Sequence, residues 1–402
     1  MTVRHVVVVV GTRPEALKLL PVIDACEANP ALRVTFLATA QHRDMLDQVT
    51  RVWGRYPDMD LDLMQPGQDL TSITSAVLLA MRGAIEELKP DVVVLQGDTT
   101  TTFAGALACY YAKVPVAHVE AGLRTWNKYA PFPEEVNRRL TTGLADLHFA
   151  PTRVSQANLL AEGIEPSVVF VTGNTVIDAL LHIHNRTTSD AALRQTLEER
   201  YSFLSPDRKL VLVTAHRRES FGSGFEEICH GIRAIVEQDQ DVEVVYPVHL
   251  NPSVREPVNR ILREHPDRSR VHLLEPLPYV DFVYLLSRCH IVLTDSGGVQ
   301  EEAPALGKPV LIMRDVTERP EVVEAGGAIL VGADRNRIAT EVRCLLSVPE
   351  RYHEMARQRF IFGDGHAAER IAQILAENPL VVPERIHARL DERGARATLA
   401  AQ

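Results

Sequence analysis

The sequence predicts an α/β protein with two doubly wound parallel sheets, and three observations support this. Short β-branched runs alternate with helical segments along the chain, which is typical of parallel sheets covered by helices on both faces. The 402 residues exceed one ordinary hydrophobic core, and 46% of them are hydrophobic, which is enough material for two domains. Charged motifs follow the strands at their carboxyl ends, where this architecture binds ligands.

The expected elements fall into two series. Strands are predicted at residues 6–10, 34–38, 92–95, 114–118, 168–171, 210–214, 242–246, 271–274, 291–294, 310–313 and 328–331, and helices at 73–88, 226–237 and 281–288. A polar, helical stretch at 175–205 separates the series and is the expected hinge. We therefore expect a first domain at 1–175 and a second at 176–365, with a C-terminal segment 366–402 that packs back on the first and ends in an Arg- and Ala-rich tail.

Composition excludes several classes of function. The net charge of −10 argues against nucleic acid as a partner, because a phosphate backbone requires a basic face. The five cysteines are scattered, which predicts neither disulfides nor a zinc site and favours the cytoplasm. The apolar run at 6–10 is far shorter than the roughly 18 residues that cross a bilayer, so neither membrane insertion nor a targeting segment is expected.

The most informative motif follows the strand at 291–294. Ser296, Gly297 and Gly298 predict free backbone N–H groups at a helix N-terminus, where the helix dipole favours a phosphate. Glu301 and Glu302 stand one turn further on and can accept hydrogen bonds from sugar hydroxyls. The alternative is a tight strand-to-helix turn whose glutamates cap the helix.

A second motif follows the first strand. Pro14 suits a first helical turn, and Arg13 and Lys18 place two cations beside a helix N-terminus, as a diphosphate requires. Surface charges at a helix start are the alternative. The turn is not Gly-x-Gly-x-x-Gly and the chain has no phosphate loop, so we expect no nicotinamide cofactor.

Carboxylates follow the next strands of the same domain. Asp98 follows the strand at 92–95, Glu120 follows the strand at 114–118, and Glu134 lies in a proline-framed loop. Such acids near one ligand can exchange protons near neutral pH. The alternatives are an N-cap for Asp98, a loop acid near Arg124 for Glu120, and a favourable first-turn charge for Glu134.

The second domain adds basic residues at its strand ends. His216 and Arg217 follow its first strand, and His249 follows its second. A histidine there is alternatively only a structural hydrogen bonder. Arg319 follows the strand at 310–313, and we expect it to pair with a phosphate or with Glu302.

Several motifs together resemble the non-hydrolysing UDP-N-acetylglucosamine 2-epimerases. They are GTRPEALK (11–18), QHR (41–43), QGDT (96–99), HVEAGLRT (118–125), PEEVNR (133–138), HR (216–217) and the segment 294–307. The resemblance spans residues 5 to about 370. It implies a GT-B architecture with a deep interdomain cleft, a homodimer, and interconversion of UDP-GlcNAc and UDP-ManNAc for bacterial surface polysaccharides.

The resemblance also implies a role for each site residue. UDP leaves, a 2-acetamidoglucal forms, and protonation on the other face with return of UDP inverts C-2. Catalytic positions are Asp98, Glu120, Glu134 and His216; substrate-binding positions are Arg13, Lys18, Leu277, Phe282, Ser296, Gly297, Gly298, Glu302 and Arg319. No metal is expected. Members are often activated by UDP-GlcNAc through the regions of Gln41, His42, Arg43 and His249, which are alternatively structural.

Other functions stay open at this stage. A hydrolysing 2-epimerase would release free ManNAc, and a related enzyme would act on a UDP-acetamido-uronate. A GT-B glycosyltransferase would need an acceptor groove rather than three acids. A nucleotide-sugar sensor would have no need of the acids.

Overall fold

The computed structural model describes residues 3–39, 43–63, 67–263 and 268–379. Two compact units divide the chain. Domain 1 runs to Asp178 and includes the described residues from Gly365 onward, and domain 2 runs from Ala179 to Asp364. The tail expected beyond residue 380 lies outside the described part of the chain.

Domain 1 is built on a seven-stranded sheet in which every pair is parallel. The strand order is β3-β2-β1-β4-β5-β6-β7. The strands are β1 (Arg4–Val10), β2 (Leu32–Ala38), β3 (Met59–Asp60), β4 (Val92–Gln96), β5 (Val116–Val119), β6 (Leu147–Ala150) and β7 (Val169–Val171). The order reverses between β1 and β4, which is the topological switch point of a doubly wound sheet.

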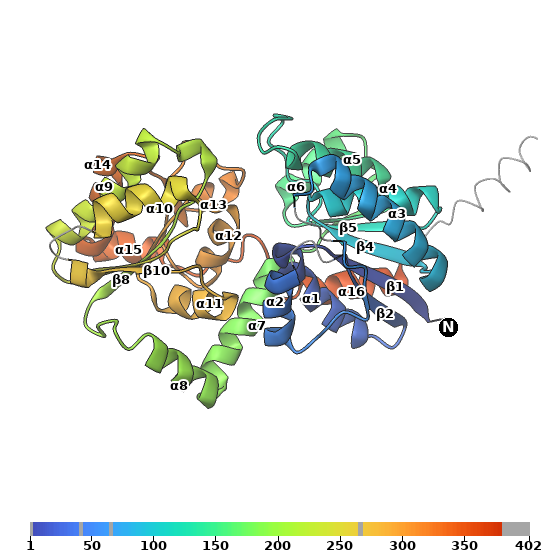
Figure 1. Cartoon of the computed structure of the whole chain (residues 1–402), viewed down its shortest axis with the longest axis horizontal. Helices are drawn as coiled ribbons and strands as arrows, with labels where there is room; N and C mark the ends of the chain where they lie inside the picture. Colours follow the sequence, from blue (N-terminus) through green and yellow to red (C-terminus); the bar gives the residue numbers. More distant parts are fainter. Residues whose placement is uncertain (1–2, 40–42, 64–66, 264–267, 380–402) are drawn as a thin grey trace, which may run out of the picture. The chain divides into compact units, whose positions relative to one another are not determined.

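The helices of domain 1 cover both faces of this sheet (Figure 1). They are α1 (Arg13–Glu27), α2 (Arg43–Trp53), α3 (Leu70–Leu88), α4 (Thr100–Tyr111), α5 (Glu134–Leu144), α6 (Arg153–Ala161), the short η1 (Pro166–Val168) and α16 (Ala367–Glu377). Successive side chains of β1 face opposite sides of the sheet, which explains why one helical layer packs on each face. Val6, Val8 and Val10 pack in one core with α1 and α16, while Val7 and Val9 pack in another with α3 and α4, because successive strand residues face opposite sides.

Domain 2 repeats the same plan. Its six-stranded parallel sheet has the order β10-β9-β8-β11-β12-β13. The strands are β8 (Lys209–Thr214), β9 (Val242–Pro247), β10 (Val271–Leu274), β11 (Ile291–Thr294), β12 (Val310–Ile312) and β13 (Ala328–Leu330). Its switch point therefore lies between β8 and β11.

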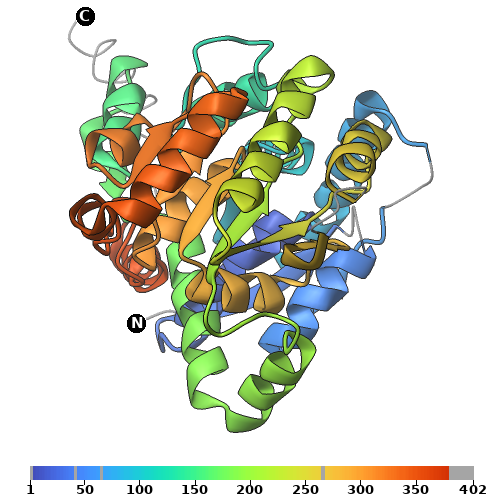
Figure 2. The same cartoon turned by 90° about the vertical axis from the view of Figure 1, so that its left-hand side faces the viewer.

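Helices flank this second sheet as well, as Figure 2 shows. They are α8 (Ala191–Arg200), α9 (Ser223–Gln238), α10 (Pro252–Val258), α11 (Tyr279–Arg288), α12 (Gly297–Ala305), α13 (Pro320–Glu324), α14 (Arg335–Ser347) and α15 (Pro349–Met355), with short turns η2 (Arg218–Ser220), η3 (Asn259–Arg263) and η4 (Arg268–Arg270). The helix α7 (Thr175–Ser189) crosses the boundary between the two units. Val211 and Val213 of β8 pack with α9 and α14 in the main core of the domain.

The predicted fold class is confirmed, and the differences are local. Two strands were not predicted: β3 has only two residues, and β6 reads Leu-His-Phe-Ala, without a β-branched residue to mark it. The strand expected at 114–118 begins at Val116, because Lys113 has a left-handed φ of +57° and Val114 donates its N–H back to Cys109. Among the described residues, no helix combines the length and the apolar character that a bilayer crossing requires.

Candidate active site

A buried carboxylate fixes the turn after β1. Thr12 caps α1, and Glu15 completes a capping box. The Glu15 carboxylate accepts from the N–H groups of Gly11 and Thr12, each at 2.7 Å, and from the hydroxyl of Thr99. Burial raises the pKa of Glu15, although the bonds from Thr99 and the two amides oppose this rise. Because Thr99 caps α4, Glu15 joins the two turns at the switch point, and these turns carry Arg13 and Asp98.

Asp98 is held by α5. The side-chain amide of Asn137 donates to the Asp98 carbonyl at 2.9 Å, and the guanidinium of Arg138 forms an ion pair with the carboxylate. The Asp98 side chain is 28% exposed, so a ligand can reach it. Thr99, and not Asp98, caps α4, which makes the helix-cap alternative for Asp98 wrong.

Glu120 follows β5 directly and has a left-handed φ of +63°. The ammonium group of Lys18 forms an ion pair with its carboxylate, and the side-chain amide of Gln96 donates to the same oxygen at 2.7 Å. Lys18, predicted as a phosphate ligand, therefore holds an acid in this structure. Arg124, the alternative partner of Glu120, makes two bonds to Glu162, at 2.8 and 2.7 Å.

Packing requires glycine at position 122, two residues after Glu120. Gly122 has a φ of +92°, and a Cβ there would lie 2.2 Å from the carbonyl oxygen of Ser155. Only glycine permits both the backbone conformation and this approach. The turn that carries Glu120 is thereby pressed against α6.

Glu134 and Glu135 occupy the first turn of α5, but they do different things. Glu134 is half-buried, and within the described chain its Oε2 atom is buried without a hydrogen-bond partner. Glu135 is fully buried and accepts from the N–H groups of Thr125 and Trp126, at 3.0 and 3.1 Å. Glu135 is thus part of the scaffold, whereas Glu134 has an oxygen available for chemistry.

His118 supports the same turns from within β5. Its Nε2 atom lies 2.7 Å from the carbonyl oxygen of Gly97. Burial lowers the pKa of His118 to about 4, against the opposing effect of the Gly97 carbonyl. The ring is therefore neutral near pH 7 and serves as a structural hydrogen-bond partner.

In domain 2 a buried carboxylate again fixes the turn after the first strand. Asp295, which directly follows β11, accepts from the N–H groups of His216 and Arg217, each at 2.7 Å. The hydroxyls of Thr214 and Thr294 lie 2.6 Å apart across β8 and β11. His216 lies beside His249, with ring centroids 5.5 Å apart and planes 17° from parallel. The two predicted histidines are thus brought together.

The guanidinium of Arg319 packs against Gly297, the first residue of α12. Ser296 is the N-cap but makes no side-chain capping bond. A Cβ at Gly297 would lie 2.6 Å from Nη1 of Arg319, so only glycine leaves room for this guanidinium. Arg319 donates to Glu301 at 2.6 Å and to Glu318 at 3.1 Å. The carboxylate that the sequence left as a possible sugar ligand, Glu301, is therefore a partner of Arg319.

The pKa of Glu318 shows that the guanidinium groups near the α12 terminus strongly favour an ionised carboxylate. Burial acts to raise the pKa of Glu318, but the guanidinium groups of Arg319 and Arg314 outweigh burial and lower the pKa to about 2. The carboxylate is ionised at neutral pH, and it holds Arg319 in place at the α12 terminus.

Glu302 lies beside an aromatic pair. Tyr279 donates its hydroxyl proton to Glu302 at 2.6 Å. The rings of Tyr279 and Phe282 are 6.4 Å apart and 24° from parallel. Phe282 and Leu277 are half-buried, at the start of α11 and just before it. This corner therefore offers a carboxylate next to an aromatic surface.

The predicted regulatory residues are only partly visible. Gln41 and His42 lie outside the described residues, and Arg43 is the first residue of α2. His249 is exposed and stacks on His216.

The sequence predictions did not include five residues that hold the predicted site residues in place. They are Glu15, Gln96 and Arg138 in domain 1, and Tyr279 and Asp295 in domain 2. The capping-box spacing of Thr12 and Glu15 was a visible signal for one of them. The others become partners only through strand order, which brings turns far apart in sequence to one sheet edge.

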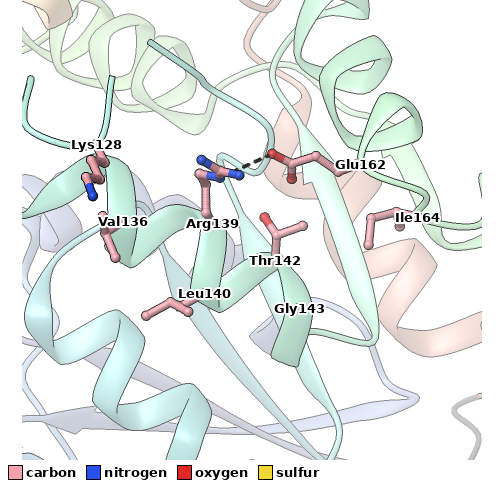
Figure 3. Close-up of a pocket in the computed structure, with 8 residues that line it drawn as sticks. All are labelled: Lys128, Val136, Arg139, Leu140, Thr142, Gly143, Glu162 and Ile164. Atoms are coloured by element: carbon pink, nitrogen blue, oxygen red, sulfur yellow. Dashed lines mark ion pairs between the residues drawn. The ribbon is translucent and has the colours of Figure 1, made fainter. Parts of the chain in front are cut away.

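A groove of about 620 Å³ lies elsewhere on domain 1, between α5 and the end of α6 (Figure 3). Its wall is formed by Lys128, Val136, Arg139, Leu140, Thr142, Gly143, Glu162 and Ile164. Arg139 reaches across it to Glu162 at 3.7 Å. None of these wall residues is a predicted site residue.

Two Rossmann-like domains, one with carboxylates at its switch point and one with a glycine-led helix terminus, are typical of the GT-B class. The family model described as UDP-N-acetylglucosamine 2-epimerase matches residues 24–376. The chain is 52% identical over 373 residues to a UDP-N-acetylglucosamine 2-epimerase of Escherichia coli (strain K12), covering 93% of this chain and 98% of that one. Identity to the enzyme of that name from Campylobacter jejuni is 44%, with 93% and 97% covered.

Solved structures agree. The UDP-GlcNAc 2-epimerase of Neisseria meningitidis bound to UDP-GlcNAc superposes with a TM-score of 0.88 at 46% identity, covering 93% of this chain and 100% of that one. The enzyme of Methanocaldococcus jannaschii in complex with UDP-GlcNAc and UDP gives 0.77 at 33% identity, covering 92% and 99%. The chain belongs to the UDP-N-acetylglucosamine 2-epimerase family, and its reaction class is epimerisation.

The contact between Gly297 and Arg319 predicts the effect of one methyl group. Gly297→Ala should displace the guanidinium from the α12 terminus. The family resemblance assigns this guanidinium to UDP, and on that assignment UDP binding should weaken about tenfold or more, as loss of a charge-assisted contact does. Isothermal titration calorimetry with UDP measures this. Gly224→Ala in α9, where a Cβ would meet Ala333 at an ordinary 3.5 Å, is the matched control. Equal affinities of the two variants would contradict the assignment.

Proposed function

We propose that the protein interconverts UDP-N-acetylglucosamine and UDP-N-acetylmannosamine by inversion at C-2, without hydrolysis. The observation that carries this proposal is the set of carboxylates in domain 1, Asp98, Glu120 and Glu134. They lie at the carboxyl ends of β4 and β5 and at the start of α5. Epimerisation needs proton exchange on both faces of one carbon, and several acids at one sheet edge suit that task.

Elimination solves the chemical difficulty of this reaction. The proton at C-2 of the sugar is not acidic, and the chain lacks a nicotinamide fingerprint that would supply a neighbouring ketone. Departure of UDP develops positive charge at the anomeric carbon and acidifies the C-2 proton. Loss of that proton gives a 2-acetamidoglucal. Protonation on the opposite face and return of UDP complete the inversion.

The domain 2 group suits the leaving UDP. The amides of Gly297 and Gly298, together with Arg319 and His216, supply positive potential for a diphosphate whose charge rises as it leaves. Arg13 of domain 1 is proposed as a further phosphate ligand. Glu302 suits the ribose hydroxyls, because a carboxylate accepts from both. The half-buried Phe282 and the backbone near Leu277 suit the uracil.

The domain 1 acids suit the sugar. Lys18 and Gln96 orient the Glu120 carboxylate, and Arg138 orients that of Asp98. Glu134 offers an oxygen that is not committed to any described group. Acids held in fixed positions in this way can act on C-2 without reorganising during the reaction.

Conservative acid variants test these roles. In Asp98→Asn, Glu120→Gln and Glu134→Gln, kcat should fall about 100- to 10,000-fold, the usual contribution of a positioned acid or base. UDP affinity should stay within a factor of three or so, because UDP is assigned to other residues. Anion-exchange chromatography should find UDP-ManNAc and no free sugar. Free ManNAc, or turnover only of a UDP-acetamido-uronate, would contradict the proposed reaction.

We also propose activation by UDP-GlcNAc through Arg43, His249 and the neighbouring Gln41 and His42. The stacking of His249 on His216 supports a link between that residue and the phosphate-binding turn. Initial rates with UDP-ManNAc alone should be low or sigmoidal and should rise when a trace of UDP-GlcNAc is added. A hyperbolic rate curve that added UDP-GlcNAc leaves unchanged would contradict this.

A homodimer is proposed from the outward surface of α3, α4 and α5. α4 packs between α3 and α5 (Figure 1), and apolar side chains on these helices are exposed: Leu79 (61%), Tyr110 (61%), Tyr111 (68%) and Leu140 (47%). Large apolar side chains that stay exposed on neighbouring helices suit an interaction surface. Tyr111→Lys should convert a dimer to a monomer in sedimentation velocity, whereas the control Tyr56→Lys, at a tyrosine that is 56% exposed, should not. A monomeric wild type, or a dimeric Tyr111→Lys variant, would contradict it.

We propose a cytoplasmic location and a role in supplying activated ManNAc for surface polysaccharides. The cysteines support the location, because Cys26, Cys109, Cys229 and Cys289 are buried free thiols, as is usual for proteins of reducing compartments.

A further inference from the structure

Asp295 has an oxygen that the fold does not explain. The side chain is fully buried, and its Oδ2 atom accepts the N–H groups of His216 and Arg217. Its Oδ1 atom has no hydrogen-bond donor among the residues that the structure describes. A buried carboxylate oxygen without a donor costs free energy, so its retention calls for a specific role.

The ring of His216 lies close to this oxygen. Its Nδ1 atom lies 3.6 Å from Asp295 Oδ1, slightly beyond hydrogen-bond distance. The ring carries its second nitrogen, Nε2, on the edge away from Nδ1. The Nδ1 edge faces the buried carboxylate, and the side chain as a whole is 42% accessible, so the ring can meet a ligand.

We propose that Asp295 is the positioning residue of His216: it fixes the His216 backbone through Oδ2, binds the Nδ1–H through Oδ1, and so turns the Nε2 edge to the diphosphate, to which a protonated ring donates. The diphosphate part of this inference rests on the proposed function. The backbone bonds and the ring contact both come from one buried side chain, so a single carboxylate can set the position and the orientation of the ring.

The charges around His216 decide whether its pKa rises or falls when the charge of Asp295 is removed. Burial lowers the pKa of His216, Asp295 raises it, and Arg217 and His249 lower it further. Among the described residues that act on this pKa, Asp295 is the one acid, and it opposes three effects that together leave the pKa of His216 lowered. Removing its charge lowers the pKa of His216, so the cationic form is lost at a lower pH.

The tautomer of His216 in the unmodified protein is the first test, and it needs no substrate. In protein labelled with ¹⁵N-histidine, above the pKa, the ring should carry its proton on Nδ1, with the signal assigned by its loss in His216→Asn. A dominant Nε2–H tautomer would overturn the proposal. The tautomer is read in the unmodified protein, and the variant serves only to assign the signal.

Two variants then separate charge from structure. Asp295→Asn keeps an oxygen for both backbone amides but removes the charge, so the His216 pKa measured by NMR should fall by about one to three pH units, as loss of a close opposite charge does. His249→Gln, which removes a group that lowers this pKa, should shift it upward. An unchanged or raised His216 pKa in Asp295→Asn would overturn the proposal.

Kinetics distinguish this inference from the proposed function. If the cationic ring serves the leaving diphosphate, kcat of wild type falls as the pH rises through the His216 pKa, and in Asp295→Asn this fall occurs at lower pH. If the NMR results hold and the protein does not epimerise UDP-GlcNAc, only the proposed function fails. If epimerisation proceeds but the tautomer or the pKa shift is absent, only the Asp295 assignment fails.

Discussion

Each domain fixes the turn after its first strand with one buried carboxylate, and the placement of the proposed site residues depends on this constraint. Such a turn leaves backbone N–H groups unpaired at a sheet edge, where water would otherwise satisfy them. In domain 1 Glu15 accepts hydrogen bonds from the N–H groups of Gly11 and Thr12. In domain 2 Asp295 accepts hydrogen bonds from the N–H groups of His216 and Arg217. Both carboxylates link the two strands that border the switch point. The turns there are consequently held before any ligand arrives, which is what preorganised electrostatic catalysis requires.

The same principle governs the cations of a chain whose net charge is −10. An acidic protein cannot attract a nucleotide by its overall field, so positive potential must be concentrated locally. The key cations are each held by a carboxylate, as Lys18 is by Glu120, Arg138 by Asp98 and Arg319 by Glu301. These pairs fix the direction of the charged groups. Changing either side chain of a pair removes a contact that orients its partner.

Sequence reasoning was sufficient for the fold, because valine-rich runs such as residues 6–10 specify strands that are buried on both faces. It was also sufficient to locate residues at strand ends, because chain order alone places Asp98 and Glu120 there. Sequence reasoning could not identify which side chains these residues contact. The contacts between Glu15 and Thr99, or between Asp295 and His216, join residues about 80 positions apart, and they depend on the reversal of strand order at each switch point. The pairing of Arg319 with Glu301 depended similarly on the absence of a side chain at Gly297.

The central claim is that the domain 1 acids exchange the C-2 proton with solvent during an elimination that UDP reverses. Proton NMR of UDP-GlcNAc with the enzyme in heavy water tests it most directly. The account predicts UDP-ManNAc formation accompanied by deuterium at C-2 of both UDP-sugars, with UDP returned to the sugar. Formation of the epimer with the original proton still at C-2 would contradict it.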